Sequence, residues 1–437
     1  MIILKRYGLN STLRRRSDPM KYCTRCVYPE NHPLNITFDE QGVCSGCRVH
    51  EEKDSLDWKK REEELKTILE EYKSKSKGHY DCIIPVSGAK DSYFIVHLIK
   101  NIYGMKPLLV SYNKHYNTEI GIRNLAYLRT IFDCDILTQT IDPKTVKKIT
   151  RATLRDMGSI YWHCLAGQTV FPVQIAVRLK IPLIIWGAHQ GIDQVGMFSH
   201  LDNVEMTRKY RKEHDLMGWE AEDLVSEAMY LSEKDLQAFA YPHDKEIEKV
   251  GVRGIYLNNY IRWDSKKQHE DMIQLYGYES FPQQRTFDTY NDVDCHYYSD
   301  LHDHIKFLKY GYGKVTDHVC REIRLKRMTR EEGIDLIKKY SNIPPKNIHL
   351  FLDWLGITED GLQYFIDQYR NKDIWKKNDQ GVWELRDNIL HHQHDPHVDE
   401  VRLEKKEECH FQITPLKKNP SPHTRQILIG RGFVDRE

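Results

Sequence analysis

Short apolar runs alternate with stretches of helical periodicity through the first half of the chain, and this alternation predicts strands joined by helices. The predicted strands are 81–86, 107–112, 135–141 and 181–186, and helices at 90–103 and 118–132 follow the first two strands. Strands joined by helices run parallel, so the pattern predicts a doubly wound parallel α/β sheet with helices on both faces. Ligands bind such sheets beyond the carboxyl ends of the strands. We therefore expect a ligand site where these strand ends meet.

The pattern differs on either side of this sheet. Residues 202–250 are rich in Glu, Lys and Met with helical spacing, residues 254–260 predict one more short strand, and residues 264–370 predict further helices. We expect six segments along the chain. They are a disordered extension at 1–19, a zinc-binding knuckle at 20–53, a helical connector at 54–78, the sheet domain at 79–262, a helical substrate or partner region at 263–371, and a C-terminal tail at 372–437.

The turn after the first predicted strand combines small residues with a lysine and an aspartate. Its residues are Ser87, Gly88, Ala89, Lys90, Asp91 and Ser92. The small side chains let the backbone approach a pyrophosphate, and the first N–H groups of the next helix point at the anion. Lys90 adds a positive charge, whereas Asp91 would repel phosphate unless Mg²⁺ lay between them. The turn is neither a Walker motif nor a Gly-x-Gly-x-x-Gly motif. It predicts an ATP site with Mg²⁺ at Asp91, and an ordinary strand-to-helix turn is the alternative.

This turn resembles the PP-loop, Ser-Gly-Gly-x-Asp-Ser, of the ATP pyrophosphatases, which adenylate a carbonyl oxygen and then admit a nitrogen or sulfur nucleophile. Ala89 replaces the second glycine, which is a small change if the backbone φ is negative there and a serious one if φ is positive. The resemblance implies the PP-loop ATP pyrophosphatase fold, which is adenine nucleotide alpha hydrolase-like. It also implies that the second strand end and a later glycine-containing segment complete the nucleotide site. The matching residues are Ser111, Asn113 and Gly187, followed by His189 and Asp193, which would position metal or substrate or be ordinary loop residues.

Four cysteines near the N-terminus have the spacing of metal ligands. Cys23 and Cys26 form one C-x₂-C pair, and Cys44 and Cys47 form another. Two-residue spacing lets both thiolates of a pair face one cation, and four sulfurs close a tetrahedral structural Zn²⁺ site. Unliganded reduced cysteines and an iron–sulfur cluster are the alternatives. We expect a zinc ribbon.

A segment of the predicted helical region places lysines and glycines beside aromatic rings. Lys306, Tyr310 and Lys314 belong to it. The mix suits a nucleotide-sugar, because the lysines would meet its diphosphate and the rings would stack on its base. A packed turn between helices is the alternative. Further along, Thr329 and Glu332 fit a capping box that starts a helix.

Composition narrows the function classes. The 437 residues include 65 basic and 64 acidic side chains, a net charge of +1 with no basic excess that would favour nucleic acid. We find no apolar run of about 18 residues, so we expect no membrane span. Ten cysteines in so long a chain do not indicate a disulfide scaffold, and the cytoplasm is the simplest compartment.

Three motifs together resemble one family. The Cys₄ knuckle, the SGAKDS loop and a KYGYGKVTDH segment followed by REIR and MTREE are similar to those of the N-acetyl sugar amidotransferases of bacterial surface-polysaccharide and nonulosonic acid biosynthesis. The resemblance implies a ligase of O-antigen or other lipopolysaccharide biosynthesis that converts an acetamido group of a nucleotide-linked sugar to an acetamidino group. ATP would adenylate the amide oxygen, releasing pyrophosphate, and ammonia would then displace AMP from the O-adenylyl imidate. Lys90 and Asp91 would be the catalytic residues.

The ammonia needs a source. We identify no glutaminase nucleophile on a glycine-flanked elbow in the sequence. The resemblance implies that a separate glutaminase subunit, alone or together with a cyclase-like ammonia-channel protein, delivers it.

Two other functions stay open at this stage. A PP-loop tRNA thiolase also combines zinc-type cysteines with adenylation of a base carbonyl, and Cys164 is the candidate sulfur carrier. The near-neutral charge weighs against tRNA binding. A non-catalytic zinc-ribbon interaction protein would have no use for the SGAKDS loop.

Overall fold

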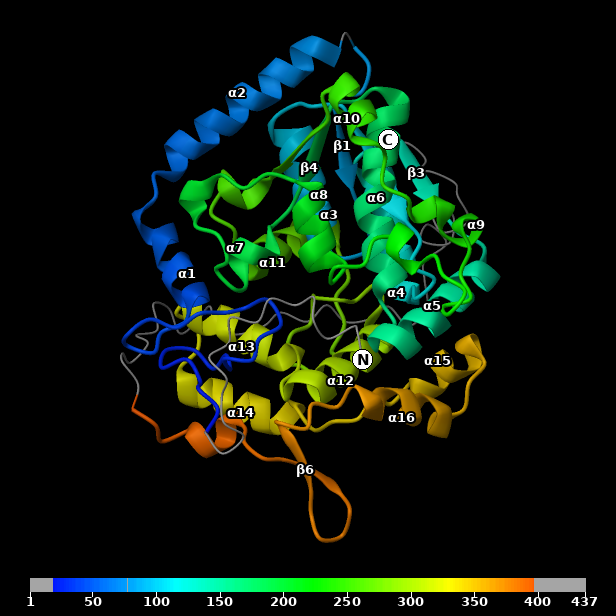
Figure 1. The fold of residues 1–437 in the computed structure, drawn as a ribbon. Coiled ribbons are helices and arrows are strands. Elements are labelled where there is room, and N and C mark those ends of the chain that lie inside the picture. Colours follow the sequence, from blue (N-terminus) through cyan, green and yellow to red (C-terminus); the bar gives the residue numbers. More distant parts are fainter. Residues whose placement is uncertain (1–18, 77, 397–437) are drawn as a thin grey trace.

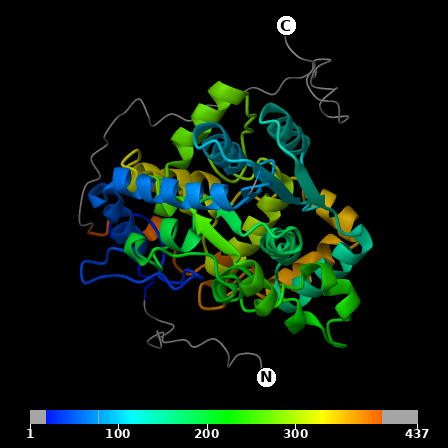
Figure 2. The same cartoon turned by 90° about the horizontal axis from the view of Figure 1, so that it is seen from above.

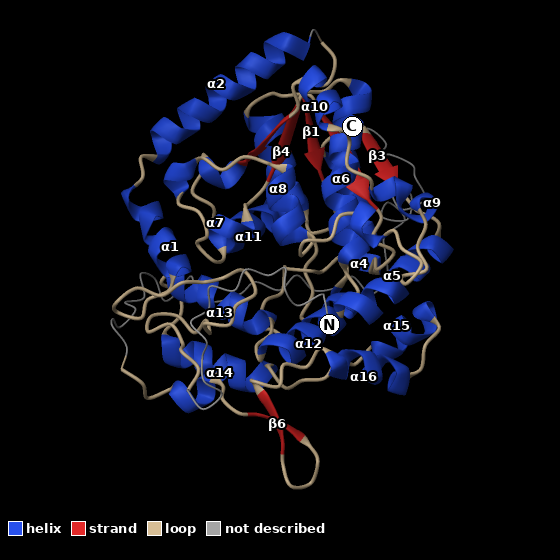
Figure 3. Ribbon diagram, in the orientation of Figure 1, coloured by secondary structure: helices blue, strands red, loops and turns tan. Residues whose placement is uncertain are grey.

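The computed structural model describes residues 19–76 and 78–396 of the chain. The predicted disordered extension, apart from its last residue, and the tail beyond residue 396 lie outside the described residues. In the described part, helices surround a central sheet, and a small hairpin stands apart from it (Figure 3).

Five parallel strands form the central sheet, in the order β3-β2-β1-β4-β5. Their bounds are β1 Cys82–Pro85, β2 Pro107–Tyr112, β3 Ile136–Gln139, β4 Leu183–Trp186 and β5 Arg253–Tyr256. In the register, Ile83 of β1 lies opposite Leu108 of β2 and Ile184 of β4. The chain moves outward from β1 to β3 and then crosses to β4 on the other side of β1. The sheet therefore has a topological switch point between β1 and β4, and the prediction of a parallel α/β sheet is confirmed.

The two faces of the sheet bury alternate side chains of each strand. Ile84 and Leu109 pack into one core, and Ile83 and Val110 pack into another. The helices on the first face are α2 Trp58–Ser76, α3 Lys90–Val96 with its π-helical continuation at His97–Ile102, α4 Glu119–Ile131 and α11 Ser265–Tyr276. The helices on the second face are α6 Trp162–Leu179 and α10 Asp244–Val250, and α5 Pro143–Met157 packs beside α6. Figures 1 and 2 both show α2 as a long helix along the outside of the sheet domain.

Local sequence signals set the ends of several helices. The Thr118 hydroxyl accepts the Gly121 N–H at the start of α4, and Asp142 caps α5, whose first residue is Pro143. The capping box of Thr329 and Glu332 is confirmed at the start of α14. These helix ends are therefore fixed by interactions between residues that lie close together in the sequence.

The segment between β4 and β5 contains short helices. Its helical spacing predicted helical structure over 202–250, and the structure has short helical turns there, including α8 Arg208–Tyr210 and α9 Glu233–Leu236, followed by α10. Gly218, at φ +86°, and Asn203, at φ +48°, interrupt the helical backbone. The α8 turn lies beside the carboxyl ends of β4 and β5, where Tyr210 lines a cavity together with Trp186 and Tyr256.

A second layer lies below the carboxyl ends of the strands in Figure 1. It contains α12 His296–Tyr310, α13 Lys314–Arg324, α14 Arg330–Tyr340, α15 Ile348–Leu355, α16 Glu359–Gln368 and the hairpin of β6 Trp375–Lys377 and β7 Trp383–Leu385. The cysteine knuckle, which ends in α1 Ser45–Ser55, packs on this layer, since Val27 and Tyr28 share a core with Val319 of α13. The N-terminal knuckle and the C-terminal helices thus form one unit across the sheet's ligand edge.

One expectation for this layer was wrong in detail. Residues 277–295, inside the predicted helical region, form an irregular segment between α11 and α12. The predicted tail begins with the β6–β7 hairpin, where the Trp375 indole N–H donates to the Leu308 carbonyl at 2.8 Å. No helix within 19–76 or 78–396 is long and apolar enough to cross a membrane.

Candidate active site

The SGAKDS turn joins β1 to α3 at the switch point of the sheet. The Ser92 hydroxyl accepts the Ser87 N–H at 2.9 Å, and the Ser87 hydroxyl accepts the Ala89 N–H at 3.1 Å. Ala89 has φ −90°, so an alanine fits there without strain. The condition under which Ala89 replaces the second glycine of the motif is therefore met.

A close contact with α4 fixes the turn. A Cβ on Gly88 would lie 2.2 Å from the Gly121 carbonyl oxygen, and a Cβ on Gly121 would lie 2.5 Å from the Asp294 Cα. Only glycine fits either position. The turn therefore rests on α4, and α4 rests on the irregular segment that leads into α12.

The charged pair of the turn has one buried and one open member. The Lys90 ammonium lies 2.5 Å from the Asp91 carboxylate and 3.3 Å from the Ser265 hydroxyl, and the Lys90 side chain is 10 % exposed. The Asp91 side chain is 42 % exposed. Lys90 is therefore part of the buried wall of the site. The Asp91 carboxylate is open to solvent and can bind a ligand or a metal ion.

Three buried polar side chains beside this turn have no hydrogen-bond partner among the described residues. They are Tyr278 and Tyr290, through their hydroxyls, and His269, through both ring nitrogens. The His269 ring centroid lies 4.7 Å from each tyrosine ring, and the Tyr290 ring faces Lys90 with its centroid 6.0 Å from the ammonium. Burial lowers the pKa of His269 to about 3, so the imidazole is neutral. An unpartnered buried polar group costs about 1–3 kcal/mol, which a polar ligand beside Lys90 would offset.

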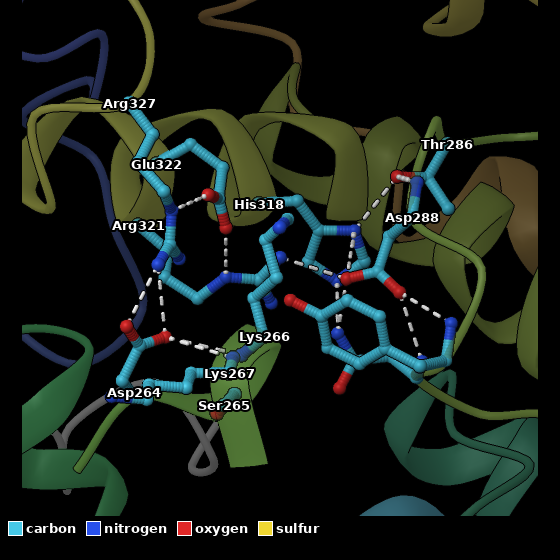
Figure 4. A network of polar contacts seen from close by, with 12 residues as sticks. Asp264, Ser265, Lys266, Lys267, Thr286, Asp288, His318, Arg321, Glu322 and Arg327 are labelled. Carbon is cyan, nitrogen blue, oxygen red and sulfur yellow. Dashed lines mark hydrogen bonds and ion pairs between the residues drawn. The ribbon is translucent and has the colours of Figure 1, made fainter. Parts of the chain in front are cut away.

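A network of ion pairs joins the lower layer to the start of α11, beside the turn (Figure 4). Arg321 of α13 pairs with Asp288 at 2.8 Å and with Glu322 at 2.7 Å, and Arg327 pairs with Glu322 at 2.6 Å. Arg327 also lies 2.8 Å from Asp264, the N-cap of α11. The next residue, Ser265, accepts a hydrogen bond from Lys90. Burial alone would raise the pKa of Asp288, but the nearby His318 and Arg321 hold it well below its usual range. A continuous chain of contacts therefore runs from Lys90 to the C-terminal layer.

The end of the second strand carries a further ion pair. Ser111 is buried in β2, and the Asn113 amide is engaged by Thr140, at 3.3 Å, and by the His115 N–H, at 3.0 Å. The next residue, Lys114, lies 2.8 Å from Asp294. Sequence reasoning missed this pair, although Lys114 is the second residue after a predicted strand.

The residues of the later glycine-containing segment contact different parts of the structure. Gly187 lies beside α3, where a Cβ would be 3.1 Å from Ile95. His189 lines a cavity on the other face of the sheet, and burial lowers its pKa to about 4. Asp193 forms an ion pair with Lys53 of α1 at 2.5 Å. The Asp193 N–H donates to the His189 carbonyl at 3.0 Å, but the His189 side chain faces the cavity and the Asp193 side chain contacts the knuckle.

The aromatic lysine segment makes internal contacts. Lys306 lies 2.5 Å from Asp317, and Lys314 lies 2.7 Å from Asp300. The Tyr310 carbonyl accepts the Asn31 amide at 2.8 Å. These contacts are typical of the packed-turn alternative, and a substrate role for the three residues stays a prediction.

The four cysteines of the knuckle are buried, and their sulfurs all lie within 4.8 Å of one another. The Cys23 sulfur accepts the Cys26 N–H at 3.4 Å and the Cys44 N–H at 3.2 Å, and such bonds stabilise a thiolate. The Arg324 guanidinium donates to the Cys44 sulfur at 3.5 Å and to the Gln194 carbonyl at 2.6 Å. The four thiols fit a structural Zn²⁺ site, which would fold the knuckle and hold it on the loop after β4.

Two cysteines, Cys44 of the knuckle and Cys164, bear on the alternatives. Cys44 stands between Gly42 and Gly46, which is the Gly-x-Cys-x-Gly spacing of a glutaminase elbow and was overlooked in the sequence. Its place inside the buried cysteine cluster gives it the environment of a metal ligand. Cys164 is also buried, 3.5 Å from a His163 ring nitrogen, and burial raises its pKa well above the usual thiol value. A neutral buried thiol lacks the thiolate that a sulfur carrier needs.

Most of the lower layer matches a known family model. Residues 284–389 match the family model described as "LPS biosynthesis protein WbpG-like, C-terminal domain". This WbpG-like region contains α12–α16. It also contains Asp288, Arg321 and Arg327 of the ion-pair network near Lys90.

A second similarity covers part of another protein. The chain is 27 % identical over 115 residues to an uncharacterised protein of Methanocaldococcus jannaschii, covering 26 % of this chain and 41 % of that protein. The chain therefore matches about two fifths of the length of this curated relative, whose name states no activity.

Proposed function

We propose that the chain is an ATP-dependent amidotransferase of surface-polysaccharide biosynthesis, which converts an acetamido group of a nucleotide-linked sugar to an acetamidino group. The observation that carries the proposal is the placement of the SGAKDS turn. It lies at the switch point of a parallel sheet, beside unpartnered buried polar groups, and is connected by ion pairs to a WbpG-like C-terminal layer.

The first step forms one P–O bond and breaks another. The amide oxygen of the acetamido group attacks the α-phosphorus of ATP, and pyrophosphate leaves with the electrons of the broken bond. Lys90 spreads the charge that develops on the phosphates, and the turn places the backbone close to them. Asp91 would hold Mg²⁺, which when bound neutralises phosphate charge. The Tyr278 and Tyr290 hydroxyls supply hydrogen bonds at the buried end of the site.

The second step replaces oxygen by nitrogen. Ammonia attacks the imidate carbon with its lone pair, loses a proton, and AMP leaves with the former amide oxygen. The balance is acetamide, ATP and ammonia giving acetamidine, AMP and pyrophosphate. Because water would compete with ammonia, we expect the lower layer, which lies beyond the carboxyl ends of the strands (Figure 1), to shelter the imidate.

The ammonia would come from a separate glutaminase subunit. Within the described residues, Cys44 is the cysteine with elbow spacing, and it lies in the metal-ligand cluster. We therefore expect this chain alone to use free ammonia but not glutamine.

The test measures AMP formed from ATP with the purified full chain. UDP- and CMP-linked acetamido sugars are supplied with ammonium, and tRNA with a sulfur donor is the comparison. AMP formation that needs both the sugar and ammonium, with an acetamidino product by mass spectrometry, supports the proposal. Sulfur transfer to tRNA, or AMP formation with neither sugar, would refute it.

A further inference from the structure

A cavity of about 140 Å³ opens at the carboxyl ends of β4 and β5, on the face covered by α6. Trp186 and Tyr256 line it from the strand ends, Thr169 lines it from α6, and Tyr210 and Arg211 line it from the α8 turn. The proposed adenylation uses none of these side chains.

Five of the twelve residues that line the cavity carry aromatic rings. The His189 imidazole packs among them, with its ring centroid 4.2 Å from that of Tyr210 and 4.6 Å from that of Tyr256. Trp186 and Tyr241 add two further rings to the lining. Aromatic faces accept a planar ring by stacking.

Several polar atoms of this lining have no hydrogen-bond partner among the described residues. His189 is 1 % exposed, and both of its ring nitrogens are unpartnered. The Trp186 indole N–H and the Nη2 of Arg211 are buried and unpartnered as well. Because buried polar groups are normally hydrogen-bonded, these atoms indicate a ligand with both donors and acceptors.

The charges around the cavity favour a neutral ligand. Arg211 forms a buried ion pair with Glu220 and donates to the Thr169 hydroxyl at 2.8 Å. Burial raises the pKa of Asp215 to about 7 and lowers that of His189 to about 4, so neither adds a full charge at neutral pH. A phosphate group would therefore find no unpaired cation among the residues that line this cavity.

The size of the cavity fits a six-membered ring. Its volume is close to the roughly 150 Å³ of an engineered protein cavity that holds benzene. We propose that this cavity binds the pyrimidine base of the nucleotide-linked sugar, with the indole N–H of Trp186 and the guanidinium of Arg211 donating to base carbonyls. A His189 ring nitrogen accepts from the base or donates to it, according to its tautomer.

The position of the cavity agrees with such a substrate. This assignment rests on the proposed function. β4 is the neighbour of β1 in the sheet, and neighbouring strands lie about 4.8 Å apart. A base beyond β4 and β5 therefore leaves the diphosphate and sugar to extend along the strand ends toward the loop after β1.

The experiment measures nucleoside binding without ATP, so it is independent of turnover. Uridine, cytidine, adenosine and N-acetylglucosamine are each titrated against the full chain by saturation-transfer NMR. We expect uridine or cytidine to bind, with the strongest transfer to the base protons. Trp186→Phe and His189→Phe should each weaken that binding about fivefold, the effect of one lost hydrogen bond. Trp383→Phe on the β6–β7 hairpin makes the same chemical change outside the cavity and should leave binding unchanged.

Three results would overturn the assignment. They are the absence of pyrimidine binding, binding that neither cavity variant changes, and an effect of the variants on N-acetylglucosamine or adenosine instead. If one cavity variant fails to fold, the other variant still tests whether the pyrimidine binds in this cavity. If AMP still forms from an acetamido sugar, only the cavity assignment fails; if nucleosides bind as expected but no AMP forms, only the adenylation fails.

Discussion

Replacing Asp91 with asparagine separates catalysis from folding at the SGAKDS turn. The Asp91 carboxylate lies 2.5 Å from Lys90, but its side chain is 42 % exposed. An ion pair at that exposure contributes about 0–1 kcal/mol, because water screens the two charges. We therefore expect the free energy of unfolding to fall by no more than about 1 kcal/mol, with a shift of the unfolding temperature of at most a few degrees.

Turnover should respond far more strongly than stability. Asparagine cannot hold Mg²⁺ against the phosphates as a carboxylate does, and removing charge stabilisation of a transition state costs about 10²–10³ in rate, or about 2.7–4 kcal/mol. The assay follows AMP formation by chromatography across a Mg²⁺ titration, alongside thermal unfolding by circular dichroism.

A matched variant controls for the loss of a surface carboxylate. Asp156 also pairs with its neighbour in sequence, Arg155, at 2.5 Å, and its side chain is 34 % exposed. Asp156→Asn should leave AMP formation unchanged. The reasoning is refuted if Asp91→Asn keeps the turnover and the Mg²⁺ dependence of the unchanged chain, or if its loss of activity simply follows unfolding.

Other outcomes follow from the remaining sites. We expect one Zn²⁺ per chain by elemental analysis, and Cys26→Ser should lose the metal and unfold at lower temperature; iron, or no metal in freshly purified chain, would contradict this. Asp288→Asn should destabilise the chain by about 3 kcal/mol in chemical denaturation, because it removes one of the two buried carboxylates that pair with Arg321 and leaves only Glu322, which also pairs with Arg327. Since the folded pKa of Asp288 is lowered, its contribution is present above about pH 4 and is lost as pH falls through the folded pKa, so the variant should lose less stability on acidification. With ammonium salts, AMP formation should rise with pH because only free ammonia has a lone pair, and glutamine consumption by this chain alone would contradict the need for a partner.

The sheet could be predicted because its signals are local. The apolar run at 107–112 is the observed β2, and the small residues of the turn after β1 lie at the predicted strand-to-helix junction. Thr329 and Glu332 likewise form their capping box within four residues. In each case neighbours in sequence decide the structure.

The partners of the site could not be predicted, since they come from distant segments. The charge pattern of the sequence does not show that Asp288 meets Arg321, or that Lys114 meets Asp294 across 180 residues. Asp193 shows the same difficulty within a single sequence motif. It follows His189 in one motif, but its carboxylate pairs with Lys53 of the knuckle.

The fate of the acetamido oxygen tests the central claim most directly. The sugar is supplied with ¹⁸O in its acetamido carbonyl, together with ATP, ammonium and the full chain, and the released AMP is analysed by mass spectrometry. Attack of the amide oxygen on the α-phosphorus predicts one ¹⁸O in the phosphate of each AMP formed. Unlabelled AMP, with the ¹⁸O in water or retained in the sugar, would contradict adenylation of the acetamido group.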